Sequence, residues 1–120
     1  MEKKNLYIKG ALNCAETIID TYNKEHGTKI PVAIGSGMGS GVTCGSLCGA
    51  INAGVAIIGF TTGRESHLEE NVARSLVNQY MKKCREKYNS EICIDLKNNK
   101  ITCEEIVDFA YNELNKILKK

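Results

Sequence analysis

Aromatic and helix-breaking residues are scarce in this sequence. Its 120 residues include no tryptophan, two phenylalanines and one proline. So few aromatics offer no platform for stacking nucleic-acid bases, and a formal net charge of +2 provides no basic face for a phosphate backbone. We therefore expect no nucleic-acid partner. A single proline and an apolar fraction of 42% are typical of a folded protein with a helical tendency.

The beginning of this sequence does not predict a secretion signal. The first ten residues, MEKKNLYIKG, contain charges but neither an apolar core nor a small-residue cleavage site. We therefore expect a cytoplasmic protein, and the length predicts a single domain over residues 1–120. In a reducing compartment, the six cysteines are expected to be core residues, metal ligands or redox thiols rather than structural disulfides.

Charged residues are absent from residues 30–63, which raises the question of a membrane segment. Small residues recur at every fourth position from Gly41 to Ala53, as they do in packed transmembrane helices. The continuously apolar part is short, however, and Asn52 lies in its middle. We therefore favour a buried central helix, and a small subunit of a membrane transport or redox complex is the alternative.

Hydrophobic periodicity predicts a small all-α bundle of about four helices, and no segment shows the two-residue alternation of a strand. The first expected helix covers residues 6–24. The second covers residues 43–58 and is apolar on all sides, which predicts a central position. It follows a glycine-rich connection, residues 26–42, and connections of this length are usually functional or mobile.

The last two expected helices have capping motifs at their starts. The third begins at Thr62 or Ser66, because each is followed three residues later by a glutamate. The fourth follows Thr102 as its N-cap, and Glu105 completes a capping box. Between these helices, residues 89–100 form a polar connection with room for one short extended or helical turn.

Cysteine is the residue type that points to chemistry. The first turn of the second helix would contain Cys44, with Cys48 one turn above it, and Cys103 would begin the fourth helix. A helix N-terminus favours a thiolate and can lower a cysteine pKa from about 8.5 towards 7. If the fourth helix packs back on the first two, Cys14, Cys44, Cys93 and Cys103 meet at one site. Thiolates perform disulfide exchange and also bind zinc, copper(I) and iron–sulfur clusters.

Burial in the core is the competing explanation for these cysteines, because free cysteine is among the most buried residue types. We expect Cys84 to be a core residue, whereas Cys48 could belong to the site or to the core. No CxxC pair, zinc-ribbon spacing or ferredoxin spacing occurs, so the spacing identifies no metal. The alternative function is a non-catalytic helical interaction module with core cysteines.

The glycines of GSGMGSGVTCGSLCGA do not form a nucleotide-binding motif, because neither a dinucleotide fingerprint nor a P-loop is present. They could instead let the chain approach a cluster or substrate closely and present backbone amides to sulfur. Both histidines, His26 and His67, are expected at the surface, and a role of His67 as a ligand or proton donor is the alternative. The candidates for a cofactor-binding role are Gly39, Gly41, Gly45 and Gly49.

Four separate cysteine contexts resemble those of a known family. They are Asn13-Cys14-Ala15-Glu16, the glycine-rich run into Cys44-Gly45-Ser46-Leu47-Cys48-Gly49, Cys93 before Ile-Asp, and Cys103-Glu104-Glu105-Ile106-Val107. In order and character they resemble the C_GCAxxG_C_C family of redox-active proteins over nearly the whole chain. The family's four cysteines correspond to Cys14, Cys44, Cys93 and Cys103. Ser46 replaces the family's usual alanine, and Cys48 replaces a threonine or another small residue.

The resemblance implies a helical, mostly prokaryotic, redox-active protein without a known reaction. Its four cysteines are the expected catalytic thiols or the ligands of an iron–sulfur cluster or other metal, with Cys48 as an additional candidate ligand. We favour a cluster or metal slightly over dithiol–disulfide exchange, because four ligands fit a closed coordination set better than an attacking and resolving pair. A redox partner of unknown identity is expected, and the apolar glycine-containing helix makes a homodimer plausible.

Overall fold

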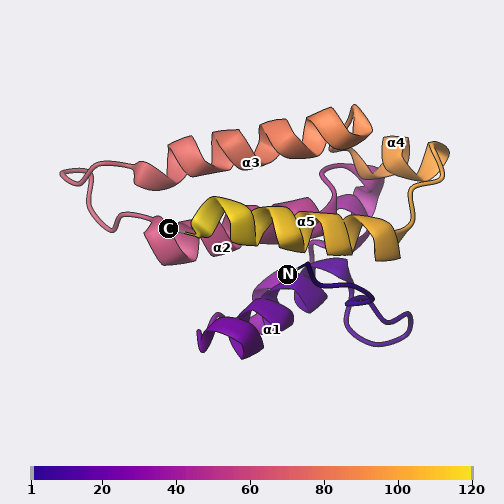
Figure 1. Cartoon of the computed structure of the whole chain (residues 1–120), viewed down its shortest axis with the longest axis horizontal. Coiled ribbons are helices and arrows are strands. Elements are labelled where there is room, and N and C mark those ends of the chain that lie inside the picture. The colour runs from indigo at the N-terminus through magenta and orange to yellow at the C-terminus, as the bar shows by residue number, and fades with distance from the viewer. Residues whose placement is uncertain (1, 120) are drawn as a thin grey trace.

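The computed structural model describes residues 2–119 and shows an all-α bundle, as predicted (Figure 1). Four helices of 13 to 17 residues form the bundle, and one short helix and two single helical turns connect them. In chain order the elements are α1 (Cys14–His26), η1 (Val32–Gly35), η2 (Gly41–Gly45), α2 (Gly49–Thr62), α3 (Val72–Tyr88), α4 (Cys93–Asn98) and α5 (Cys103–Leu118).

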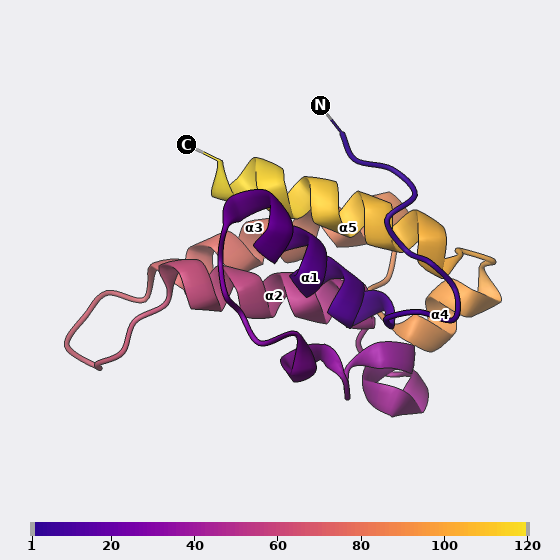
Figure 2. The same ribbon diagram turned by 90° about the horizontal axis from the view of Figure 1, so that it is seen from below.

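Helix α2 occupies the centre of the bundle, which confirms the prediction from its apolar composition. It packs against α1, α3 and α5, and Ile51, Ile57 and Ile58 are fully buried (Figures 1 and 2). Gly54 lets α3 approach closely, because a Cβ at this position would lie 2.1 Å from the Tyr80 hydroxyl. Among residues 2–119, no helix combines the length and apolarity needed to cross a membrane.

The fourth predicted helix is found as α5, beginning at the expected residue. The Thr102 side chain accepts a hydrogen bond from the Glu105 amide at 3.1 Å, and the helix then buries one apolar stripe against α2 and α3. The short turn predicted between the last two long helices is α4. These features depend on neighbouring residues in the sequence, so the sequence pattern was sufficient to predict them.

The first helix is shorter at its start than predicted. It begins at Cys14, where Asn13 and Glu16 form a reciprocal capping box. Residues before it form an extended segment instead, because the amides of Asn5 and Leu6 donate hydrogen bonds to the Asp108 carboxylate on α5. Leu6 and Tyr7 of this segment therefore pack against the core without helical structure, whereas Ile8 is exposed.

The predicted start of the third helix is also wrong. Helix α3 begins after Asn71, whose side chain accepts from the Arg74 amide, and residues 63–71 form an exposed connection. The Ser66 hydroxyl accepts from the Leu68 amide, as in a turn. The segment RESHLEE has too little apolar surface to form a buried helical face, so its capping motifs do not start a helix.

The second helix starts six residues later than predicted, at Gly49 rather than Thr43. The four residues from Ser40 to Thr43 have positive φ angles of 55°, 65°, 58° and 60°, which places them in a left-handed turn. Each non-glycine residue in this conformation costs about 1–2 kcal/mol. The turn packs against Cys93, where a Cβ on Gly41 would lie 2.5 Å from the Cys93 Cβ. Tertiary packing therefore overrides the local preference for a helix.

Candidate functional site

Four cysteines from four separate segments line one small cavity of about 50 Å³. Each lies at the start of a helix: Cys14 begins α1, Cys48 is the N-cap of α2, Cys93 begins α4 and Cys103 begins α5. In Figure 1 this end of the molecule is the one that contains α4. Larger hollows, such as one of about 550 Å³ between the N-terminal segment and α1, contain no cysteine.

A short antiparallel pairing holds two of these helix starts together. Leu47 and Ile92 form an isolated β-bridge. The Cys48 amide donates to the Glu91 carbonyl at 2.9 Å, and the Cys93 amide donates to the Ser46 carbonyl at 2.6 Å. Because these bonds flank both cysteines, they fix the start of α2 beside the start of α4.

Two glycines allow the chain to close tightly around the thiols. A Cβ on Gly49 would lie 2.7 Å from the Cys14 sulfur and 2.6 Å from the Met38 carbonyl oxygen. Gly41 packs against Cys93 in the same way, and both glycines line the cavity. The sequence predicts that these glycines let the chain approach a cluster or substrate closely. In the structure they let it approach other parts of the same chain.

The other two candidate glycines lie farther from the thiols. Gly39 packs against the Asn13 side chain, and Gly45 has a φ of 77° with only ordinary contact to Ile94. Neither lines the cavity. A role for the four glycines in binding a cofactor stays a prediction.

Burial raises the pKa values of three cavity thiols. The pKa of Cys48 rises to about 11, mainly through burial, although the amides of α2 partly offset this. Burial also raises the pKa of Cys14, and the negative charge of Cys103 adds to the effect. For Cys103 itself, burial outweighs the lowering by the Lys97 ammonium, so its pKa is raised. The predicted lowering of the Cys103 pKa at a helix N-terminus is thus wrong.

Access distinguishes an outer pair of cavity cysteines from an inner pair. Cys93 and Cys103 are half-buried, whereas Cys14 and Cys48 are only 8% and 5% exposed. A reactant from solvent therefore meets the outer pair first.

Cys44 lies outside this cavity, contrary to its expected place in the first turn of the second helix. It is exposed in η2, where its sulfur hydrogen-bonds to the Gly41 carbonyl at 3.7 Å. Cys48, which could not be assigned from the sequence, occupies the cavity instead. The one sequence signal for this arrangement is that Cys48 directly precedes the uncharged, mostly apolar run that forms α2.

The remaining cysteine and one histidine lie away from the cavity. Cys84 is fully buried, as predicted, and its pKa is raised to about 12, first by burial. His67 is exposed in the connection between α2 and α3, at the end of the molecule opposite α4 (Figure 1). It therefore does not contribute a ligand or a proton to the four cysteines in this structure.

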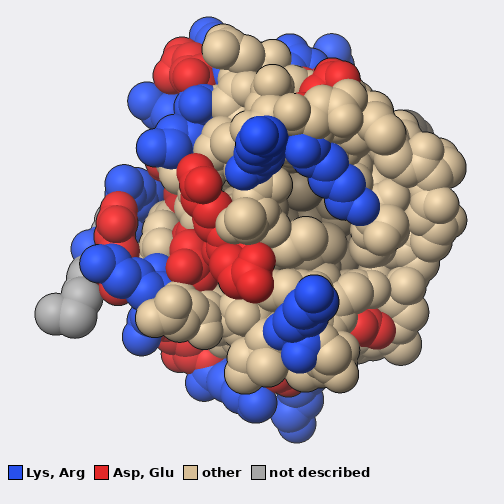
Figure 3. All heavy atoms as spheres, turned by 90° about the vertical axis from the view of Figure 1, so that its right-hand side faces the viewer, with Lys and Arg blue, Asp and Glu red and all other residues tan. Residues whose placement is uncertain are grey.

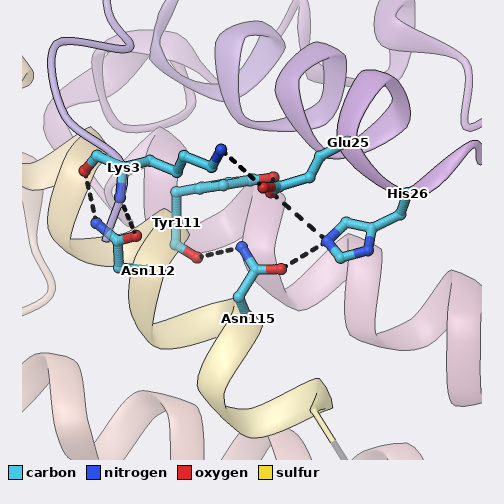
Figure 4. Close-up of polar contacts among 6 residues, drawn as sticks. All are labelled: Lys3, Glu25, His26, Tyr111, Asn112 and Asn115. Atoms are coloured by element: carbon cyan, nitrogen blue, oxygen red, sulfur yellow. Dashed lines mark hydrogen bonds and ion pairs between the residues drawn. The ribbon is translucent and has the colours of Figure 1, made fainter. Parts of the chain in front are cut away.

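A second polar cluster joins the N-terminal segment, α1 and α5 (Figure 4). The Tyr111 hydroxyl donates to the Glu25 carboxylate, which also pairs with the Lys3 ammonium at 3.1 Å. His26 hydrogen-bonds to the Asn115 side chain at 2.7 Å. The Tyr111 contact is the largest cause of a lowered pKa for Glu25. These contacts hold the N-terminal segment in place and include no cysteine.

The four cavity cysteines have the right chemistry for a metal site but not the right arrangement. Thiolates are soft ligands suited to zinc, copper(I) and iron–sulfur clusters. Within residues 2–119, however, no three histidine, cysteine, aspartate or glutamate side chains are arranged to hold a metal ion. The residues present therefore do not form a ready-made coordination site.

A family model matches residues 12–117 of the chain, and its description is Putative redox-active protein (C_GCAxxG_C_C). The chain belongs to this family. No curated protein and no solved structure gives a significant match. In this member of the C_GCAxxG_C_C family, the structure gathers three of the four cysteines assigned from the family pattern. Cys48 takes the place in the cavity that the pattern assigned to Cys44.

Proposed function

We propose that this C_GCAxxG_C_C protein is a cytoplasmic thiol redox protein that reduces disulfides through its four cavity cysteines. The observation that supports this function is the meeting of Cys14, Cys48, Cys93 and Cys103 at one small cavity. Each comes from a different helix start, and close packing at Gly41 and Gly49 keeps them together. Core cysteines without a function would not need to share one cavity.

The accessible pair, Cys93 and Cys103, performs the exchange in this proposal. The thiolate of one forms a bond to a sulfur of the external disulfide, whose S–S bond breaks and releases one thiolate. The second cysteine then attacks the mixed disulfide, forms an internal Cys93–Cys103 bond and releases the other thiolate. Two electrons pass from the protein to the external disulfide, and the two cysteine protons pass to the released thiolates.

The raised pKa values support the direction of electron flow. Strong protein oxidants have low-pKa cysteines, because a stabilised thiolate favours the reduced form. Here burial disfavours the thiolates of Cys14, Cys48 and Cys103. The reduced protein is therefore the electron donor, and its reduced state suits the cytoplasm.

A redox titration tests this function. The protein is equilibrated anaerobically in thiol–disulfide buffers of graded potential, and free thiols are counted by alkylation and intact mass. We expect wild type to lose two thiols in one reversible step, and C93S and C103S each to lose that step. C44S is the matched control, and we expect it to keep the two-thiol step. A two-thiol step that persists in both C93S and C103S would contradict the proposed function.

A metal or cluster bound by the cavity cysteines is the second candidate, because four soft donors line one cavity, although their side chains would have to rearrange to coordinate it. Cys14, Cys48, Cys93 and Cys103 would hold it, and an iron–sulfur cluster held there would supply one-electron chemistry. Anaerobic purification followed by metal analysis and a visible absorption spectrum tests this version. Metal or a cluster absorption that is present in wild type and lost in C48S would support it. Colourless, metal-free protein with a reversible dithiol would leave only the exchange function.

A further inference from the structure

The rim of the cysteine cavity carries one charged side chain, and that side chain is positive. Lys97 lines the cavity together with cysteine, serine, glycine and apolar residues, and no carboxylate lines it. Figure 3 looks onto this end of the molecule. Lysine or arginine side chains project around a central hollow beside a broad uncharged surface, and a cluster of acidic side chains borders the hollow on one side.

The inner wall of the cavity is also electropositive. Helix α2 runs for 14 residues, has no acidic residue in its first turn and has no side-chain cap. Its partial positive charge is therefore not compensated locally. Burial raises the pKa of Cys48, which lines the cavity, and the nearby backbone amides of Ala50 and Ile51 lower it in part. The positive end of α2 thus faces the thiols from inside, while Lys97 lies at the rim.

The carboxylate of Glu104 opposes the positive charge of Lys97 at the Cys103 thiol. Glu104 in the first turn of α5 raises the pKa of Cys103, but the Lys97 ammonium lowers that pKa by more. At Cys103, the positive charge of Lys97 therefore outweighs the negative charge of Glu104.

We infer that the site selects anionic disulfides, whose negative groups lie beside Lys97 while one sulfur enters the cavity. This inference rests on the proposed disulfide exchange. Size supports it, because a cavity of about 50 Å³ is far smaller than typical ligand pockets of about 300–1,000 Å³ and admits only part of a substrate. The charged groups of a substrate must then stay at the rim, within reach of Lys97.

Three small disulfides of similar size and different charge test the inference. They are dithiodipropionate, which is anionic, bis(hydroxyethyl) disulfide, which is neutral, and cystamine, which is cationic. Reduced C44S protein is used so that the exposed cysteine outside the cavity does not react. Each rate is divided by the rate of mercaptoethanol with the same disulfide, which removes differences in intrinsic reactivity.

We expect the normalised rates to fall in the order anionic, neutral, cationic. A unit charge about 8 Å away in water changes a rate about two-fold, so the extremes should differ by about five-fold. High salt should reduce the ratio of the fastest to the slowest normalised rate. In the C44S background, K97Q should remove much of the difference among the three normalised rates, and K97E should reverse their order. The control K82Q, on the exposed side of α3, should leave the three normalised rates unchanged.

The outcomes separate this inference from the function on which it rests. If C44S protein forms no internal disulfide with any of the three reagents, the proposed exchange itself is wrong. If it reacts with all three at equal normalised rates, or if K97E leaves the order unchanged, the exchange stands and the selection of anionic disulfides is wrong.

Discussion

Replacing Gly49 with alanine should disrupt the packing of the cysteine cavity where Gly49 contacts Cys14 and Met38. The added Cβ would lie 2.6 Å from the Met38 carbonyl oxygen and 2.7 Å from the Cys14 sulfur. Both separations are shorter than any normal contact of a Cβ, so one of these groups must move. The Met38 oxygen belongs to the backbone and the Cys14 side chain is buried, so neither moves freely. Overpacking of this kind costs about 1–3 kcal/mol.

Gly59 on the same helix provides the matched control, because a Cβ there meets nothing within 4 Å. Alanine at Gly59 should stabilise the protein by up to about 1 kcal/mol through its higher helix propensity. Urea unfolding followed by circular dichroism measures both variants. We expect the G49A and G59A free energies of unfolding to differ by about 1–4 kcal/mol. Equal unfolding midpoints would refute the tight packing of Gly49 against Cys14.

Three further predictions concern the turn, a helix cap and the polar cluster. V42G should stabilise the protein by about 1 kcal/mol in urea unfolding, because glycine relieves the cost of a φ of 58°, and a loss of stability would argue against the left-handed turn. T102A should destabilise by about 1 kcal/mol through loss of the α5 cap, whereas an unchanged midpoint would show that this cap contributes nothing. Y111F removes the hydrogen bond that lowers the pKa of Glu25. The stability gap between wild type and Y111F should be full at neutral pH and narrow as pH falls below about 4.3, where the carboxylate becomes protonated; a gap that is constant with pH would contradict this.

The sequence predicted those parts of the fold that depend on neighbouring residues. Thr102 and Glu105 lie three positions apart, so their cap was readable without knowledge of the packing. The start of α2 was not readable, because the turn before it is held by Gly41 against Cys93, about fifty positions away. A capping motif at Ser66 failed for a related reason, since nothing nearby offers a surface against which a helix could bury a face.

The candidate site was likewise predicted in part, and the errors again arose where distant contacts decide the structure. Cys14, Cys93 and Cys103 were expected to meet, and the structure places all three at one cavity. Cys44 was expected with them only because a helix was predicted to begin at Thr43. Once α2 begins at Gly49, its N-cap is Cys48, so the error in the helix start accounts for the change of cysteine. The pKa direction of Cys103 could not be predicted either, because burial depends on the packing of the whole bundle.

Disulfide mapping of the oxidised protein tests the shared redox site most directly. The folded protein is oxidised with a small disulfide, remaining thiols are alkylated, and peptides are analysed by mass spectrometry. Chymotryptic cleavage after Leu47 separates Cys44 from Cys48. We expect a Cys93–Cys103 linkage, with Cys84 recovered as a free thiol and Cys44 in no disulfide with another cysteine of the chain. A linkage that includes Cys44, or no linkage among the four cavity cysteines, would contradict a redox site built from Cys14, Cys48, Cys93 and Cys103.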